Sequence, residues 1–353
     1  MEKINYSQIY TKLTKGLSPK TKDIFDRRFG VKAPASVKPG KGQVVQIETL
    51  ESIGKTLGIT RERVRQIEEA GFSFIRKNHE EMLDNLFVQL TSYLQDSGGF
   101  KKEEIILNEL GGAKNKPYVL FLLTLSGQFT RVCEKKENYN FWALGKESEM
   151  QVKEKLQSLV SDIDKQGKLL DKNQVFASLA SQHGLGSEAM ASYLEISKKI
   201  KENKEGKLGL ITWPEINPRG VKDRAFLVFK KHQKPLHFRE ITKLIDDLQF
   251  NQPNKKTHPQ TVHNELIKDE RFVLVGRGMY ALKEWGYVPG TIKDIITKII
   301  KEKPAPAGQE EIVKEVLEQR LVAKNTVMIN LNNKKHFAKD SAGKYFLRET
   351  QVS

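Results

Sequence analysis

Four polar residues that follow a glycine turn could read the bases of DNA. They are Arg61, Glu62, Arg65 and Gln66. Arginine can bond bidentately to guanine, glutamate accepts a hydrogen bond from the cytosine amino group, and glutamine can pair with adenine. Grouped on one outward face of a helix, these side chain types predict contacts with base edges in the major groove.

Two short helices would place these side chains. Residues 50–57 have the apolar spacing of one buried helix face, and Gly58 permits the left-handed backbone of a tight turn. Ile59 can fill the corner, and the Thr60 hydroxyl can cap the next helix. That helix is expected to bury four residues, which leaves the polar residues outside: Val64, Ile67, Gly71 and Phe74. The arrangement predicts a helix-turn-helix, in which the small residue Gly54 lies where the helices cross. An ordinary solvent face laced by pairs four residues apart is disfavoured, because Arg61 and Arg65 would repel each other.

The segment "TLESIGKTLGITRERVRQIEEAGFSFIRK" resembles the promoter-reading region 4 of primary sigma-70 family factors, and "LSPKTKDIFDRRFG" resembles the preceding helix. The resemblance covers roughly residues 7–80. It implies that Arg61, Glu62 and Gln66 contact bases of a minus-35-like promoter element, and that Arg65 contacts bases or phosphate. Lys55 and Thr60 complete the predicted DNA-binding set. The resemblance also implies that the helix before the turn holds the flap of the RNA polymerase beta subunit through Ile24, Phe25, Arg28 and Phe29.

Three features depart from that family. The connector at residues 31–48 is longer than the usual link, which weakens the expectation of polymerase binding. Gly71 replaces a good helix former at a cost of about 1 kcal/mol, and a bend before Phe72 is one possible result. No later segment resembles the sigma regions that clamp the polymerase or melt the minus-10 element. We therefore expect the chain not to act as a complete sigma factor.

A second pattern recurs every 65 to 72 residues after position 80, and each copy ends in an aromatic or leucine-containing strand. Each copy is predicted to contain three helices and a β-hairpin, as in a winged helix. The expected fold is mainly α with small β-hairpins (α+β): a helix-turn-helix domain followed by a tandem array of four winged-helix domains. The predicted domains are residues 1–80, 81–148, 149–216, 217–288 and 289–353.

The third copy carries a resemblance of its own. "PLHFREI", "TVHNEL" and "RFVLVGRGMYALKEW" are similar to the HARE-HTH family of winged helices, which is also seen in the delta subunit of bacterial RNA polymerase. Thr257 is expected to cap its third helix, with Pro259 at an early position. Residues of this helix and the hairpin are possible secondary DNA contacts: Lys255, Lys256, Gln260, Thr261, His263, Asn264 and Arg277. A winged helix that serves protein contact is the alternative.

Charge is distributed unevenly along the chain. The formal net charge of +16 divides into +7 for residues 1–80, −1 for 81–147, 0 for 148–216, +6 for 217–288 and +4 for 289–353. Basic ends suit a polyanion such as DNA, and a solvated lysine-rich surface is the alternative. The segment "PYVLFLLTL" in the first copy is almost wholly apolar and cannot read DNA. The first two copies are therefore expected to be spacers or protein-docking surfaces, and the last two possible DNA contacts.

Several classes of chemistry are not expected. Cys133 is the single cysteine, predicted to be a core thiol, so no internal disulfide can form. His232, His237, His258 and His263 lack metal-ligand spacing, and no nucleotide-binding or hydrolase motif occurs. We expect no enzyme activity, cofactor, metal or small-molecule substrate. The absence of a secretory signal and of a long apolar run predicts a cytoplasmic, nucleoid-associated protein without membrane contact.

The sequence as a whole predicts a bacterial transcription-associated protein that binds double-stranded DNA and contacts RNA polymerase to regulate initiation. Two alternatives stay open at this point. One is a non-catalytic interaction protein that occupies the polymerase flap in competition with a sigma factor. The other is a DNA-binding architectural or defence-associated module.

Overall fold

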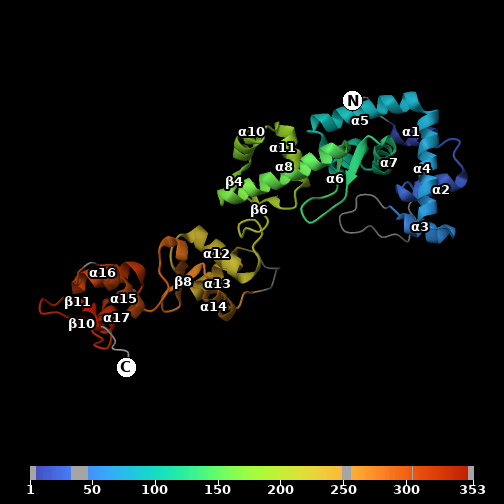
Figure 1. Ribbon diagram of the computed structural model, residues 1–353. Helices are drawn as coiled ribbons and strands as arrows, with labels where there is room; N and C mark the ends of the chain where they lie inside the picture. Colours follow the sequence, from blue (N-terminus) through green and yellow to red (C-terminus); the bar gives the residue numbers. More distant parts are fainter. Residues whose placement is uncertain (1–4, 33–46, 249–255, 304, 349–353) are drawn as a thin grey trace. The chain divides into compact units, whose positions relative to one another are not determined.

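A computed structural model describes residues 5–32, 47–248, 256–303 and 305–348 (Figure 1). The chain divides into two compact units, residues 1–212 and 213–353. Helices predominate, and the described sheets are small and antiparallel. The expected class, mainly α with small β-hairpins, is confirmed.

The first unit begins with a head of four helices, residues 5–78. Its elements are α1 (Tyr6–Leu13), α2 (Pro19–Arg28), α3 (Leu50–Leu57) and α4 (Arg61–Asn78). All four helices start at a side chain that caps a free backbone amide: Asn5 accepts from Gln8 N, Ser18 accepts from Thr21 N, and Thr49 and Thr60 do the same for α3 and α4. The long helix α4 runs unbroken through Gly71, so the sequence there causes no interruption.

The first repeat follows the head without a linker. Its elements are α5 (Glu80–Asp96), β1 (Phe100–Lys102), α6 (Glu103–Gly111), α7 (Lys116–Ser126), β2 (Phe129–Val132) and β3 (Phe141–Leu144). The strands form one sheet in the order β1-β3-β2, with Phe100 opposite Ala143 and Phe129 opposite Leu144.

The second repeat completes the first unit. Its elements are α8 (Gly145–Gln166), β4 (Leu170–Asp171), α9 (Lys172–Gln174), the π-helical turn η1 (Val175–Leu179), α10 (Ala180–Gln182), α11 (Ser187–Ile196), β5 (Ile200–Glu202) and β6 (Lys207–Leu210). Its sheet has the equivalent order, β4-β6-β5. It packs on the first repeat where the Ser192 hydroxyl donates to Ser97 O at 2.9 Å and the Phe100 and Tyr193 rings lie 4.6 Å apart.

The third repeat opens the second unit. Its elements are α12 (Gly220–His232), β7 (Leu236–His237), α13 (Phe238–Asp247), α14 (Pro259–Lys268), β8 (Phe272–Gly276), β9 (Met279–Leu282) and the 3₁₀ turn η2 (Lys283–Trp285). The sheet order is β7-β9-β8. Pro259 is the first residue of α14, as expected, but Thr257 does not cap that helix. Its hydroxyl donates to Asp246 Oδ1 at 2.6 Å instead, because it lies one residue before the N-cap position, His258.

The fourth repeat has the same order of helices and hairpin. Its elements are α15 (Ile292–Glu302), α16 (Gln309–Gln319), α17 (Lys324–Leu331), β10 (Phe337–Lys339) and β11 (Tyr345–Leu347). A single pair of backbone hydrogen bonds between Ala307 and Tyr345, 2.9 and 3.2 Å long, takes the place of the third strand.

The short strand before the second helix of each of the first three repeats is an addition to the predicted plan. In the third repeat it consists of only Leu236 and His237, paired with Tyr280 and Met279. A segment of two or three residues is too short to show the alternation that identifies a strand. The partner strand, many residues later, is what makes it a strand.

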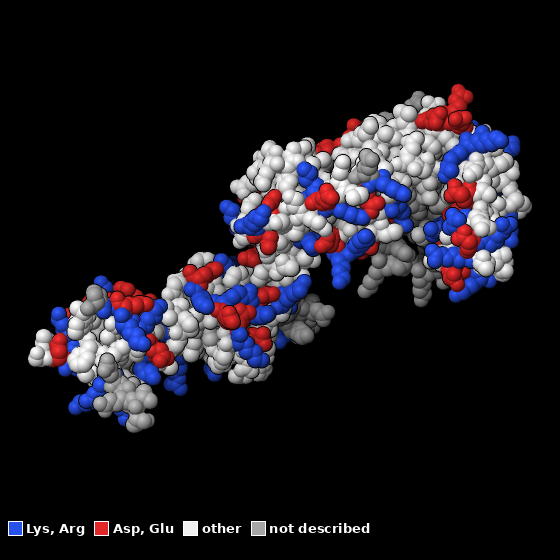
Figure 2. Space-filling view, viewed as in Figure 1, with Lys and Arg blue, Asp and Glu red and all other residues white. Residues whose placement is uncertain are grey.

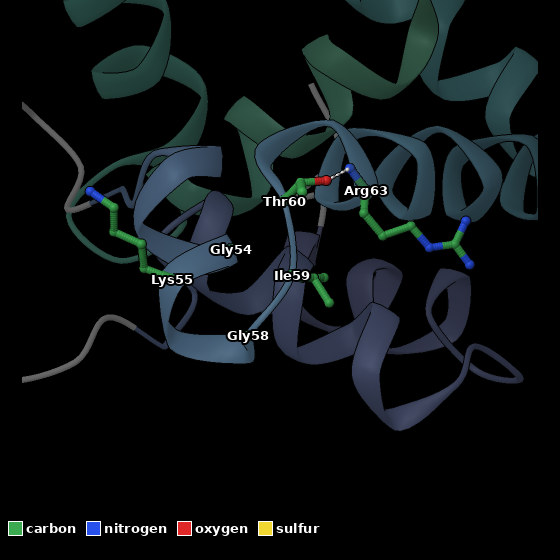
Figure 3. Close-up of a pocket in the computed structure, with 6 residues that line it drawn as sticks. All are labelled: Gly54, Lys55, Gly58, Ile59, Thr60 and Arg63. Atoms are coloured by element: carbon green, nitrogen blue, oxygen red, sulfur yellow. Dashed lines mark hydrogen bonds between the residues drawn. The ribbon is translucent and has the colours of Figure 1, made fainter.

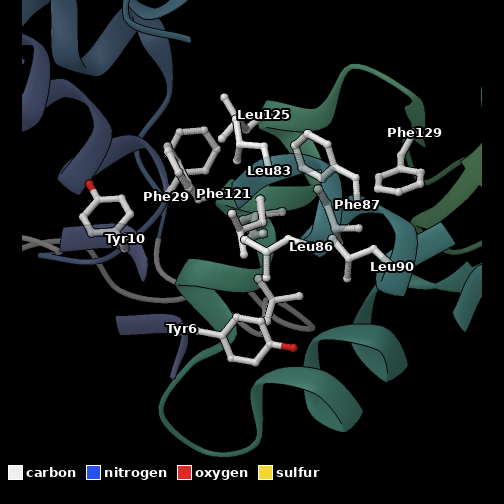
Figure 4. Close-up of a cluster of buried hydrophobic side chains, with 14 of the residues drawn as sticks. Tyr6, Tyr10, Phe29, Leu83, Leu86, Phe87, Leu90, Phe121, Leu125 and Phe129 are labelled. Atoms are coloured by element: carbon white, nitrogen blue, oxygen red, sulfur yellow. The ribbon is translucent and has the colours of Figure 1, made fainter. Parts of the chain in front are cut away.

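One core joins the head to the first repeat (Figure 4). Phe121 in α7 is fully buried, and its ring centroid lies 4.9 Å from that of Tyr10, 5.6 Å from Phe25, 5.3 Å from Phe29 and 5.9 Å from Phe72. Arg76 in α4 also donates to Leu125 O at the end of α7, at 2.9 Å. The apolar core therefore continues across residue 80, the predicted domain boundary.

Two burial predictions were wrong. Phe74 was expected inside α4, but it is 40% exposed, whereas Phe72 and Ile75 are buried. Counted from Val64, eleven residues make about three full helical turns and reach Ile75, whereas ten residues stop about 80° short at Phe74. Cys133 was expected in the core and is exposed, because it follows the inward-facing Val132 at the end of β2.

Candidate nucleic-acid interface

A tight turn between α3 and α4 sets the geometry of the candidate interface. Gly58 ends α3 in the left-handed conformation, with φ of 64°, and Thr60 Oγ1 accepts a hydrogen bond from Arg63 N at 3.2 Å. A Cβ on Gly54 would lie 2.7 Å from the carbonyl oxygen of Ile59, so only glycine permits this close crossing. Residues of the turn line an open hollow (Figure 3): Gly54, Lys55, Gly58, Ile59, Thr60 and Arg63. The predicted helix-turn-helix geometry is present.

A small apolar cluster holds the two helices together beneath the turn. Its fully buried members are Ile24, Ile53 and Val64, and Ile59 packs against them. Ile24 comes from α2, so this helix also supports the turn, from below. The orientation of α4 is therefore fixed by apolar packing and not by its exposed polar residues.

The predicted DNA-binding residues lie on the surface of this arrangement. All are exposed: Lys55, Thr60, Arg61, Glu62, Arg65 and Gln66. With about 100° of rotation per residue, Arg61, Arg65 and Gln66 span about 140° of the helix surface. Val64 and Ile75 lie outside this arc, about 60° and 40° from its Arg61 edge, and both are buried in the core. The polar side chains thus share one outward face over the first two turns of α4.

Some of these polar groups bind each other in the free protein. Arg65 donates to both carboxylate oxygens of Glu62, with Nη2 to Oε1 at 2.8 Å, and Arg63 donates to Gln66 Oε1 at 3.1 Å. The hydrogen bond from Arg65 holds the pKa of the Glu62 carboxyl below its ordinary value, so Glu62 is ionised at neutral pH. Figure 2 shows Lys and Arg interspersed with Asp and Glu over the head, on the right of the view. These exposed pairs are weak enough to exchange for bases or phosphates.

Gly71 is explained by close packing of α4 on α2. A Cβ on Gly71 would lie 2.7 Å from Phe25 Cζ and 2.8 Å from Thr21 Cγ2. Phe25 is fully buried and its ring stacks on Phe72 at 5.0 Å, so it has no room to move. The glycine that departs from good helix formers therefore allows the two helices to touch.

The predicted polymerase-binding residues do not form a free surface. Ile24 and Phe25 are fully buried and Phe29 is 4% exposed, because α3, α4 and α7 cover them. Arg28 is half-buried and donates to Glu48 O at 3.1 Å. Contact of Phe25 and Phe29 with another protein would require α7 to leave the core.

Comparison with known families agrees with this geometry. Residues 15–77 match the family model Sigma-70, region 4. Residues 219–285 match a second model, HARE-HTH, whose description includes the ASXL and restriction endonuclease HTH domains. No curated protein matches the chain. Both models describe helix-turn-helix domains that bind DNA, which supports a DNA-binding role for the chain. Both resemblances seen in the sequence are confirmed.

The candidate contacts of the HARE-HTH repeat are in mixed environments. Lys256, Gln260, Thr261, Asn264 and Arg277 are exposed, and Gln260 donates to Asn264 Oδ1 at 3.2 Å. Lys255 lies outside the described residues.

His263 has a different environment from those exposed residues. Its ring lies 4.8 Å from that of Phe238 and 5.8 Å from that of Tyr280, and the residue is half-buried. The imidazole ring therefore lies on the side of α14 that faces the core of the repeat, and this position limits how far it can reach toward a ligand.

The hairpin of the HARE-HTH repeat is used within its own unit. Leu321 N, from the fourth repeat, donates to Val275 O at 2.7 Å, and a Cβ on Gly276 would lie 2.7 Å from Leu321 O. Arg320 reinforces the junction by donating to Val288 O at 2.6 Å and Gly290 O at 2.8 Å. One side of β8 therefore packs on the next repeat, whereas Arg277 at the tip stays exposed.

Among the described residues, no group of three or more His, Cys, Asp or Glu side chains is placed to hold a metal ion. The helices of the described ranges include none long and apolar enough to cross a membrane.

Proposed function

We propose that this protein is a sequence-specific, transcription-associated DNA-binding protein that reads a minus-35-like promoter element with the exposed face of α4. The observation that carries the proposal is the outward group Arg61, Glu62, Arg65 and Gln66 on a capped helix within the region 4 match. A helix entering the major groove by its first turns would bring Arg61 and Glu62 to the base edges.

The same head favours DNA over the polymerase flap as its ligand. The polar face of α4 is exposed, whereas Phe25 in α2 and Phe29 at its C-terminal cap are covered by Phe121 of α7. Competition with a sigma factor for the flap would need those aromatic residues, so it is the weaker candidate. A regulatory contact with RNA polymerase would have to use another surface of this chain.

The four repeats are proposed to be winged helices, which makes five domains with the head. The support is a shared order of elements and a shared sheet order, β1-β3-β2, β4-β6-β5 and β7-β9-β8, with the Ala307 bridge as the fourth counterpart. The third repeat would add DNA contacts through Lys256, Gln260, Asn264 and Arg277. The first repeat would hold the head in place, because α7 is buried in the core that the head and this repeat share.

Fluorescence anisotropy of the full chain tests base reading. The probes are a duplex with a TTGACA-type element and a scrambled duplex of the same composition, each in a salt series. We expect the first duplex to bind more than about tenfold tighter, or about 1.4 kcal/mol, within the range of one good bidentate base contact.

Two matched variants sharpen the test. Arg61→Ala should remove most of the preference, whereas Lys77→Ala removes the same charge from the exposed last turn of α4, about 24 Å away, and should preserve it. Equal binding of both duplexes by the wild-type chain, with equal salt dependence, would reject base reading by α4.

A further inference from the structure

The charge of the fourth repeat is concentrated in its third helix and hairpin. Residues 289–319, which include α15 and α16, carry five basic and six acidic residues, whereas residues 324–348 carry six basic residues and one acidic residue. That acidic residue, Asp340, is engaged in the hairpin turn, where Oδ1 accepts from Lys344 N at 2.8 Å. One part of the repeat is therefore strongly basic.

One side of α17 is polar and unpacked. Taking 100° per residue, Ile329 and Asn332 lie within about 40° of Asn325 around the helix axis. Val327 and Leu331 lie on the opposite side and are fully buried. Asn325 is exposed, and Ile329 is 73% exposed although it is a large apolar residue. The side of α17 that faces solvent thus consists of the amides Asn325 and Asn332 and the apolar Ile329.

Basic side chains lie at the end of this face. Lys334 and Lys335 follow Asn332 and Asn333 and are exposed, and neither forms an ion pair within the described residues. The hairpin is tied to the same end, because Tyr345 Oη donates to Asn332 Oδ1 at 2.8 Å and Arg348 donates to Lys334 O at 3.0 Å. We call Asn325, Ile329, Asn332, Lys334, Lys335 and Arg348 the α17 face.

The equivalent helices of the other repeats lack this combination. The helix α11 carries Glu188 and Glu195, and α14 carries Glu265, whereas α17 contains no acidic residue. The helix α7 also lacks acidic residues, but its residues 119–123 and Leu125 are buried in the core. The α17 face is thus the most favourable of the four third helices for a polyanion.

We infer that the α17 face is a second DNA-binding site, separate from α4, which binds the backbone of duplex DNA through Lys334, Lys335 and Arg348. Asn325 and Ile329 would lie in the major groove. An asparagine amide can pair with adenine, and an apolar side chain can contact the thymine methyl group. The inference goes beyond the proposed function, since it concerns a repeat outside both family matches.

Charge and side chain type favour DNA over an acidic protein. A polyanion is attracted by several lysines that have no carboxylate among the described residues of the face, because each phosphate neutralised releases counterions. Protein interfaces are in general poor in lysine and rich in aromatic residues. The α17 face has the opposite composition.

Salt dependence of binding to the scrambled duplex tests the inference with the full chain. The Lys334→Ala/Lys335→Ala variant is compared with Lys298→Ala/Lys314→Ala, which removes the same charge from exposed positions on α15 and α16. The slope of log affinity against log salt should fall by about 2 in the first variant, at about 0.9 for each phosphate contact, and by much less in the control. The scrambled duplex excludes base reading by α4 from the result.

A single substitution provides a second readout. Asn325→Asp places a carboxylate in the first turn of α17, where it favours the helix but repels phosphate. We expect normal folding and at least several-fold weaker DNA binding. Equal slopes for the two lysine variants, together with unchanged binding by Asn325→Asp, would overturn the inference. Equal slopes and unchanged DNA binding are also the results expected if the α17 face binds an acidic protein instead of DNA.

Discussion

The helices α7 and α17 occupy the same place in two copies of one repeat, yet they have opposite surroundings. In α7, residues 119–123 and Leu125 are buried between the head and the first repeat. In α17, only Val327 and Leu331 are buried, and Ile329 is 73% exposed. The comparison shows that the position of a helix in a repeat does not determine its role. The apolar helix α7 stabilises the core, whereas the polar helix α17 has an exposed surface that is open to a ligand.

A lysine substitution in each helix should separate the two roles most strongly. Leu122 is 1% exposed, so Leu122→Lys would bury a charge without a partner and prevent the first unit from folding. Ile329→Lys should change the free energy of unfolding by no more than about 0.5 kcal/mol. Circular dichroism and limited proteolysis provide the measurement. If both variants were equally stable, the proposed difference between the helices would be wrong.

Truncation of the central ring of α7 is the next largest effect. Phe121→Ala should reduce the stability of the first unit by about 3–5 kcal/mol, because it leaves a cavity between Tyr10, Phe25, Phe29 and Phe72. Hydrogen exchange of α2 and α4 would report the loss within the head itself.

The control for that truncation is Phe346→Ala in the hairpin beside α17. Phe346 is 39% exposed, so its removal should cost no more than about 1 kcal/mol. Unchanged protection of the head in Phe121→Ala would show that the head does not depend on α7.

The smallest of the three effects tests how closely α4 approaches α2. Gly71→Ala would gain about 1 kcal/mol from helix propensity if the site were open. The added Cβ would instead meet Phe25 Cζ at 2.7 Å, and overpacking of this kind costs about 1–3 kcal/mol. We therefore expect a lower melting temperature for the first unit.

A matched substitution one residue earlier shows the propensity effect alone. Ala70 is exposed, so Ala70→Gly should destabilise α4 by about 1 kcal/mol. If Gly71→Ala raised the melting temperature, the close contact with Phe25 would be disproved.

The predictability of the candidate site depended on short-range signals. Gly58 ends α3 in the left-handed conformation and Thr60 caps α4, and both were predicted from residue type and position alone. Such features need only atoms a few residues apart, so the sequence specifies them directly. The exposed polar face of α4 follows from the same local periodicity.

Other features were not predictable because they depend on distant partners. The residues expected to hold polymerase, Phe25 and Phe29, are covered by Phe121, which lies more than 90 residues later in the chain. The choice of Ile75 over Phe74 as a core residue depended on the phase of α4 over three turns and on what it packs against.

The sequence alone therefore determined the helix-turn-helix, its polar residues, the recurring order of helices and hairpin and the basic ends of the chain, because caps, turns, periodicity and charge are local properties. Tertiary structure decided which apolar surfaces meet. It joined α7 to the head, paired the short strand Leu236–His237 with β9 and left the α17 face open. Apolar attraction has no direction, so a sequence shows which residues must be buried but not which partners will bury them.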